Sequence, residues 1–398
     1  MVRFIKILFL LLTGTRIGAS ALSAATVSLK KDQHDLMSAS RLMARAARRS
    51  GGAASMSEVY TSPNVLRILR VLPENLFAYM FPRANEGRGT AEAYGSYTYY
   101  NFLKAASMWP RFCDESDAGL GDLDMLCKRE LASMFAHFAQ EVGEHNYGSE
   151  YELWRQGLYH LTEMGCSDDP SQSGCEYTGG SCDCGTWQGE IWKCPVGVKY
   201  FGRGAKQLSY NFNYGPFSYA VFGDVNTLLQ APWRVVGRDE EDGWLAFASA
   251  FWFYMTPQSP KPSMHDVVTG IWIPSPGDIS GGRLGGFGVL IMIINGGIEC
   301  GNSLSSQQAI NRAVYYEHFL SAFDLPEEDP STMTCANMHQ FDASSSSFVP
   351  SYWDRDWMTD KSCKLVPYQT GFSIFDDPLD PEVPYGKCIH HFFVTSRL

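Results

Sequence analysis

Hydrophobic residues recur at helical spacing between residues 128 and 145, and this is a clear periodic signal. One apolar stripe of the predicted helix faces a core and consists of Leu131, Met134, Phe135, Phe138 and Val142. Residues 244–255 form a second dense apolar and aromatic segment, a predicted helix that ends before Pro257 because proline cannot continue it. Residues 287–294 are also apolar, but periodicity does not separate helix from strand there. Because few segments alternate with period two, the pattern predicts a mainly α-helical fold.

The first 24 residues have the order of a cleavable secretory signal peptide. Two cations, Arg3 and Lys6, precede an apolar run over residues 7–12, and small residues follow. Arg16 interrupts this run before it reaches the ~20 apolar residues that a membrane anchor needs. We therefore expect a secreted, extracellular protein, in which residues 25–93 are a leader or propeptide and an N-terminal segment.

Composition narrows the possible partners. The 398 residues are 45% hydrophobic, enough for a large core, and the formal net charge is −11. This charge argues against nucleic acid or an anionic membrane as partner and is compatible with a neutral polysaccharide. None of the 11 cysteines lies in the predicted signal, so we expect disulfides formed in an oxidising compartment. Zinc binding at Cys182 and Cys184 is the weaker interpretation because their spacing does not suit zinc, and we expect no metal, no cofactor and a monomer.

A long motif at residues 200–215 reads Tyr-Phe-Gly-Arg-Gly-Ala-Lys-Gln-Leu-Ser-Tyr-Asn-Phe-Asn-Tyr-Gly. It resembles the signature of the family 19 chitinases nearly residue for residue. Further blocks similar to that family occur in the family order at residues 97–102, 128–131, 251–257, 261–266 and 293–301.

The resemblance covers residues 94–325, which are identified as a family 19-like catalytic domain. It implies a lysozyme-like, two-lobed α-helical domain with a substrate cleft and disulfide bonds. A Pro-Glu-Glu-Asp-Pro run after Leu325 marks a boundary. Residues 326–398 then form a cysteine-containing C-terminal extension of unknown role.

Glycoside hydrolysis uses two carboxyl groups, a protonated acid and a base or nucleophile. Several glutamates lie between residues 141 and 163, and residue type alone does not choose between them. The resemblance implies that Glu144 is the general acid, because Ala139-Gln140 leads to it without a gap. The chain departs from the family here, since Gly143 replaces a histidine and His145-Asn146 replace threonines. Helical phase does not settle the choice, because Glu141 lies nearer than Glu144 to the edge of the apolar stripe, and Glu141 is the next candidate.

The general base implied by the resemblance is Glu163, at the end of a segment similar to the family's Gly-Tyr-Cys-Phe-Val-Arg-Glu. This match is weaker, with Thr162 in place of arginine and Tyr159 in place of cysteine. Glu150 and Glu152 remain alternatives, because any carboxylate in a mobile loop can serve as the base if it reaches the water molecule that attacks the sugar.

Other polar residues take their expected roles from the same resemblance. Ser209 holds the attacking water, and the residues expected to bind the sugar chain are Gln207, Asn213 and Asn295. A buried polar network beside the acid is expected to contain Asn295, Glu299 and Arg312. Helix capping, turn bonding and a surface salt bridge are the alternative roles for these residue types.

Two disulfides are implied as well. Cys300 and Cys335 resemble one family disulfide, and Cys194 resembles half of another. Its expected partner is Cys184, with Cys182 or Cys175 as alternatives.

The leading hypothesis is an endo-acting chitinase that cleaves β-1,4-linked N-acetylglucosamine by an inverting mechanism, with its carboxyl groups about 6.5–9.5 Å apart. The partners would be chitin or chitin oligosaccharides. A catalytically impaired chitin-binding protein of the same fold is the alternative, as is a hydrolase of chitosan or peptidoglycan.

Overall fold

The computed structural model describes residues 56–87, 95–115, 119, 121–177, 195–237, 241–258, 260–301 and 306–347. These residues belong to the compact unit Gly52–Leu398. The predicted signal peptide, Cys182, Cys184, Cys194 and residues 348–398 lie outside the described residues.

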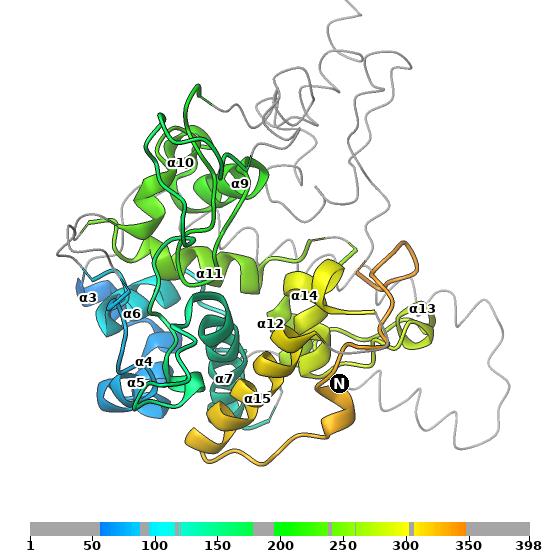
Figure 1. The fold of residues 1–398 in the computed structure, drawn as a ribbon. Helices are drawn as coiled ribbons and strands as arrows, with labels where there is room; N and C mark the ends of the chain where they lie inside the picture. Colours follow the sequence, from blue (N-terminus) through cyan, green and yellow to red (C-terminus); the bar gives the residue numbers. More distant parts are fainter. Residues whose placement is uncertain are drawn as a thin grey trace, which may run out of the picture. The chain divides into compact units, whose positions relative to one another are not determined.

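The long helix α7, Leu123–Val142, contains the apolar stripe expected from the sequence and packs against both α4 and α15 (Figure 1). Its stripe is buried because it faces the core that these helices share. The helix begins at a cap, where the Asp122 carboxylate accepts hydrogen bonds from the backbone amides of Asp124 at 3.0 Å and Met125 at 3.2 Å. It ends at Val142, so Glu141 lies in its last turn and Glu144 beyond its end.

The helix α11, Leu245–Met255, is buried on nearly every side and stops at Thr256, as predicted. Its Phe247 ring lies 5.3 Å, edge to face, from Phe102 of α6, Tyr99–Ser107. Phe102 in turn lies 5.6 Å from Phe135 of α7. Aromatic rings in tilted and edge-to-face contact pack favourably, so α6, α7 and α11 share one core.

The apolar run that periodicity could not assign is helical and forms α14, Phe287–Glu299. The helix has a kink at Asn295, where φ is −148° and ψ is 31°. It starts after Gly286, whose φ of 78° suits glycine and whose added Cβ would lie 2.5 Å from the Cβ of Thr332. The following helix α15, Gln307–Ala322, packs on α14 as well as on α7.

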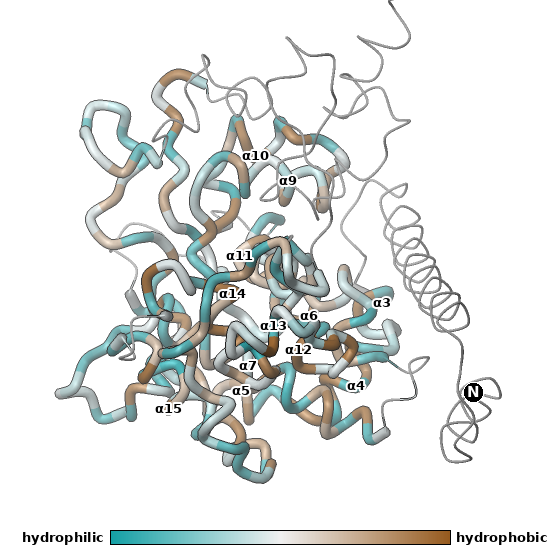
Figure 2. Tube along the Cα trace, turned by 90° about the vertical axis from the view of Figure 1, so that its right-hand side faces the viewer, coloured by the Kyte–Doolittle hydropathy of each residue, from teal (hydrophilic) through white to brown (hydrophobic). Residues whose placement is uncertain are grey.

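The other helices among the described residues are α3 (Met56–Val59), α4 (Pro63–Val71), α5 (Glu74–Met80), η1 (Leu153–Arg155), α9 (Asn211–Phe222), α10 (Asn226–Gln230), η2 (Pro232–Val236), α12 (Met264–Val268), α13 (Pro276–Ser280) and η3 (Pro330–Thr332). Figure 1 shows α9 and α10 apart from α4 and α5, with α11 between the two groups. Polar and apolar residues alternate along α4 in Figure 2, as expected for a helix with one face on a core.

Regular strands are missing from the described part of the chain, where β structure is limited to isolated bridges such as Thr162 with Arg203. The prediction of a mainly α-helical fold is therefore confirmed. Within the same residues, no helix combines the length and apolar character that crossing a bilayer requires.

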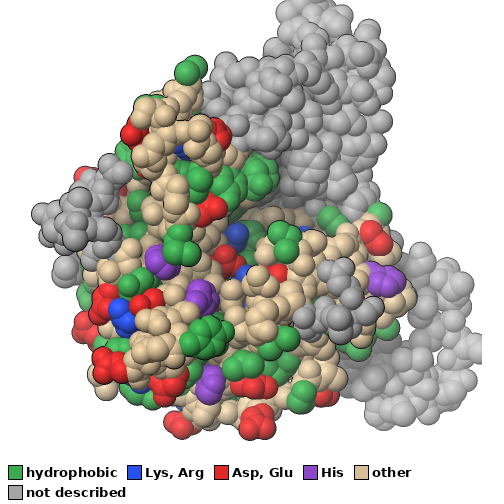
Figure 3. All heavy atoms as spheres, in the orientation of Figure 1, with side chains coloured by type: hydrophobic (Ala, Val, Ile, Leu, Met, Phe, Trp, Pro, Cys, Tyr) green, Lys and Arg blue, Asp and Glu red, His purple; other side chains and the backbone are tan. Residues whose placement is uncertain are grey.

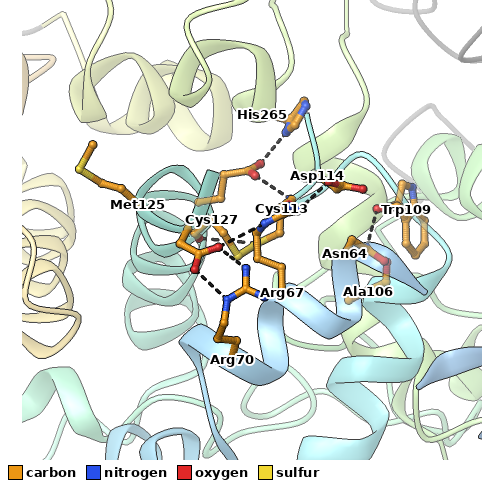
Figure 4. The surroundings of a disulfide bond; sticks show 12 residues. Asn64, Arg67, Arg70, Ala106, Trp109, Cys113, Asp114, Met125, Cys127 and His265 are labelled. Carbon is orange, nitrogen blue, oxygen red and sulfur yellow. Dashed lines mark hydrogen bonds and ion pairs between the residues drawn. A yellow bond between two sulfur atoms is a disulfide. The ribbon is translucent and has the colours of Figure 1, made fainter. Parts of the chain in front are cut away.

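Disulfides join Cys113 to Cys127, Cys166 to Cys175, and Cys300 to Cys335. The third pair is the one that the resemblance implied. Cys175 was one alternative partner for Cys194, and its bond with Cys166 excludes that pairing. Figure 4 shows the Cys113–Cys127 disulfide beside α7, with His265 pointing toward the same helix.

Candidate active site

A buried network of charged groups surrounds Arg312, whose side chain on α15 is only 2% exposed. The guanidinium donates two hydrogen bonds to the Glu299 carboxylate, from Nε to Oε2 at 3.0 Å and from Nη2 to Oε1 at 2.9 Å. Nη2 also donates to Oε1 of Glu141 at 2.5 Å. The Asn295 amide donates to Oε1 of Glu299 at 2.8 Å, next to the kink of α14. The structure therefore brings Asn295, Glu299 and Arg312 together, and Glu141 joins them.

His137 completes this network from α7. Its Nδ1 lies 3.2 Å from Nη1 of Arg312, and its ring stacks on Phe287 with centroids 5.2 Å apart. Burial, followed by the positive charges of Arg312 and Lys206, lowers the pKa of His137 well below its ordinary value. The imidazole is therefore neutral, and Nδ1 accepts a hydrogen bond from the guanidinium.

A second cation, Lys206, approaches the network from the signature segment. Its ammonium group lies 3.7 Å from the centroid of the Phe253 ring, a cation–π contact. Burial lowers the pKa of Lys206 to about 8, although the negative charge of Glu141 opposes that shift. In Figure 3, charged side chains of both signs lie in a hollow between the part of the molecule that carries α9 and α10 and the part that carries α14.

Glu144, the acid candidate from the resemblance, lies in different surroundings. Its carboxylate forms an ion pair with Arg83 and accepts a hydrogen bond from the Asn146 amide at 3.3 Å. Arg83 also pairs with Glu86 at 2.7 Å, and the Glu86 side chain is 51% exposed. The resemblance placed the Arg312 network beside the acid, and the carboxylate that the structure places in that network is Glu141. Helical phase had left the choice open, because Glu141 lies nearer than Glu144 to the edge of the apolar stripe of α7.

Glu163, the base candidate, is attached directly to the signature segment. Its backbone amide donates to the carbonyl of Gly202 at 2.9 Å, and the Gly202 amide donates to its carboxylate Oε2 at 3.1 Å. The hydroxyl of Tyr177 donates to Oε1 at 2.5 Å. The alternatives are placed differently, since Glu150 is exposed and Glu152 pairs with Arg155 at 3.2 Å on the surface.

The predicted polar residues of the signature lie close together, Gln207 and Ser209 in the segment before α9 and Asn213 in the first turn of that helix. The Ser209 hydroxyl donates to the Gln207 carbonyl at 3.0 Å, and the Asn213 amide donates to the Ser209 carbonyl at 2.9 Å. Gln207 and Tyr210 have φ values of 54° and 70°, which are unusual for residues with side chains. Such backbone strain is often retained at functional sites.

The sequence matches a known family of glycoside hydrolases over most of its length. Residues 71–332 match the family described as chitinase class I, so the chain belongs to that family of glycoside hydrolases. Chitinase 2 of Oryza sativa subsp. japonica is 35% identical over 276 residues, which are 69% of this chain and 72% of that protein. An endochitinase of Persea americana is 33% identical over 284 residues, 71% of this chain and 77% of the relative.

A solved bacterial family 19 chitinase aligns with 67% of this chain and 100% of its own, at 26% identity and a TM-score of 0.46. Three predictions made from the sequence are therefore confirmed. The chain belongs to the predicted family, it is a glycoside hydrolase, and its fold is lysozyme-like and mainly helical, with disulfides.

Proposed function

We propose that the protein is an endo-acting chitinase that hydrolyses β-1,4 linkages between N-acetylglucosamine units with a general acid and a general base. The observation that carries this proposal is the buried pairing of Arg312 with two carboxylates, Glu141 and Glu299, in a chain of the chitinase family. The printed names of similar proteins, chitinase and endochitinase, support chitin as the substrate and cleavage within the chain.

The general acid in this proposal is Glu141, and Glu144 is the competing candidate. Glu141 lies in the last turn of α7 and contacts Arg312, so both its backbone and its carboxylate are held by buried elements. A proton donor must be held to within about 0.5 Å of its productive geometry, and rigid elements provide this better than loops. Glu144 follows the helix and pairs with Arg83, beside a largely exposed glutamate.

Arg312 has a second buried carboxylate partner besides Glu141. When Glu141 is protonated, Arg312 keeps both hydrogen bonds to Glu299, so no buried guanidinium is left without a carboxylate partner. Leaving a buried charge unpaired is strongly destabilising. Glu299 therefore keeps Arg312 paired if the contact with Glu141 changes during the reaction.

The general base in this proposal is Glu163. Hydrogen-bond donors hold both of its oxygens in place, one from Tyr177 and one from the Gly202 amide, so the carboxyl group has a fixed orientation in which to take a proton from water. Ser209 would help to hold that water, while Gln207, Asn213 and Asn295 would bind the sugar chain. Attack by the activated water on the face opposite the leaving group gives inversion at the anomeric carbon.

Paired variants test the acid. Glu141→Gln keeps a hydrogen-bond acceptor for Arg312 but cannot donate the proton, so hydrolysis of a soluble chitin oligomer should fall by a factor of about 10² to 10⁴. Oligomer binding by calorimetry and thermal stability should stay close to wild type. Glu144→Gln is the matched control and should keep most of the activity. The reverse result, an inactive Glu144→Gln and an active Glu141→Gln, would return the assignment to Glu144.

We also propose that the protein acts outside the cell. The signal-like order of the first residues supports this, as do the disulfides joining Cys113 to Cys127, Cys166 to Cys175 and Cys300 to Cys335, because such bonds persist in oxidising compartments.

A further inference from the structure

Tyr177 makes a contact that nothing in the sequence pointed to. Its hydroxyl donates to Oε1 of Glu163 at 2.5 Å, while the backbone amide of Gly202 donates to Oε2 at 3.1 Å. One oxygen of the carboxylate is thus held by a side chain and the other by the backbone of the signature segment. With one donor at each oxygen, rotation of the carboxylate about its last bond would break both hydrogen bonds.

The chain segment that precedes Tyr177 is tied to the rest of the protein at several points. The disulfide between Cys166 and Cys175 closes it into a short loop. The ammonium group of Lys199 donates to two carbonyls of the loop, those of Asp169 at 3.0 Å and Gln172 at 2.5 Å. These contacts restrict the loop to one position, which lowers the entropy cost of holding a side chain at its end.

Two further contacts attach the same loop to the signature segment. The buried Arg203 forms an ion pair with Asp168. The amide of Tyr200 donates to the carbonyl of Glu176 at 3.2 Å, directly before Tyr177. Both the loop and Glu163 are therefore anchored on residues 200–203, which fixes Tyr177 and Glu163 relative to one another.

The ring of Tyr177 is positioned by aromatic packing. It meets the Tyr210 ring edge to face, with centroids 5.1 Å apart and planes at 73°, and Tyr210 stacks on Phe212. Burial, and then the hydrogen bond to Glu163, raises the pKa of Tyr177 well above its ordinary value. The phenol therefore keeps its proton and remains a donor throughout the pH range in which a carboxylate base works.

We propose that Tyr177 is a positioning residue for the reaction: its hydroxyl holds the Glu163 carboxylate in the orientation in which it takes a proton from water. This inference rests on the proposed role of Glu163 as the general base. The loop closed by Cys166 and Cys175 serves to hold that hydroxyl in place.

The test is the pH profile of kcat/KM for Tyr177→Phe on a soluble chitin oligomer. The variant keeps the ring and its packing on Tyr210 but removes the hydroxyl, so the Glu163 carboxylate loses the hydrogen bond at Oε1. The acidic limb should move to higher pH by about one to two units, the size expected for one hydrogen bond to a charged group. KM should change little. The matched control is Tyr210→Phe, which removes a hydroxyl from the other ring of the same pair and should keep the wild-type limb.

A second variant tests the loop. The double variant Cys166→Ser, Cys175→Ser retains the Tyr177 hydroxyl but opens the loop, and it should shift the acidic limb in the same direction by a smaller amount.

A purely structural role for Tyr177 predicts a different result. Tyr177→Phe would then lower thermal stability and leave the acidic limb unchanged, and that result overturns the proposal. Wild-type turnover and Glu163→Gln are measured in the same series. If the wild type is active and Glu163→Gln is inactive, an unchanged acidic limb in Tyr177→Phe overturns the role of Tyr177 and leaves the role of Glu163 as the general base in place. If the wild type is inactive, the proposed chitinase function is wrong. If Glu163→Gln is active, Glu163 is not the general base. Either result also overturns the proposed role of Tyr177.

Discussion

At the scale of single residues, Arg312 shows how burial changes the meaning of a charged pair. From the sequence, a surface salt bridge was an alternative role for Glu299 and Arg312, and such a pair contributes little. Their side chains are 1% and 2% exposed, so the pair is buried instead. The planar guanidinium bonds Glu299 through two of its nitrogens while reaching Glu141 and His137 as well. A lysine has no such fork and could not hold all three groups.

A second buried ionic group surrounds His265, outside the candidate active site. Its Nε2 lies 2.7 Å from Oε1 of Glu115, and its Nδ1 lies 2.5 Å from Oε1 of Glu130 on α7. Glu115 also pairs with Arg111, and Glu130 accepts the backbone amide of Cys113 at 2.8 Å. Burial alone would lower the pKa of His265, but the charge of Glu130 and the hydrogen bonds to both carboxylates outweigh it and raise the pKa to about 10.

This environment predicts a histidine that stays charged well above neutral pH. Because the folded value is higher than the unfolded value of about 6.5, its contribution to stability is fully present below pH 6.5 and is lost as the pH rises through about 10. Nitrogen-15 NMR of the ring should show an imidazolium with both nitrogens protonated at pH 8. A resonance that titrates near pH 6.5 would contradict the prediction. NMR is preferable to denaturation here, because the lowered pKa of Lys206 contributes the opposite slope above pH 8.

At the scale of elements, α7 connects a capped surface end to the candidate active site. Asp122 caps its first turn, and Glu141 lies in its last turn. A helix of 20 residues spans about 30 Å, so changes at the cap should not reach Glu141.

Asp122→Ala should therefore lower the free energy of unfolding by about 1 kcal/mol and leave kcat on a chitin oligomer unchanged. Urea denaturation and initial rates measure the two effects. Asp122→Asn is the control, because its amide oxygen still accepts the backbone amides and should preserve most of the stability. Equal stability of all three proteins would show that the cap contributes nothing, and a loss of kcat would show that the two ends of α7 are coupled.

At the scale of the whole molecule, the stereochemistry of cleavage depends on how separate elements are packed. Glu141 belongs to α7, whereas Glu163 is held on residues 200–203. A base that acts through water needs carboxyl groups about 6.5–9.5 Å apart, whereas a nucleophile needs about 5–5.5 Å. If the proposed pair acts by inversion, proton NMR of freshly cleaved chitin oligomer, read before mutarotation, should show the α-anomer first. An initial β-anomer would mean retention and would require a nucleophile in place of Glu163 as a water-activating base.

The sequence alone determined the family and the helical class of the fold, and the family resemblance implied that Asn295, Glu299 and Arg312 lie in one network. These follow from local information: the periodicity of residues 128–145, the proline after residues 244–255 and the long motif at residues 200–215. The sequence did not predict whether residues 287–294 form a helix or a strand. The structure of a short apolar run depends on the elements that pack against it, and α14 packs on α12 and α15.

Only the tertiary structure distinguished the surroundings of Glu141 from those of Glu144. The two residues are separated by less than one helical turn, and pattern alone cannot say which carboxylate meets an arginine from α15. The hydrogen bond from Tyr177 to Glu163 is a similar case, because a disulfide-closed loop and the signature segment come together only in the folded chain. Contacts between residues far apart in sequence depend on packing and burial, and these are properties of the whole fold.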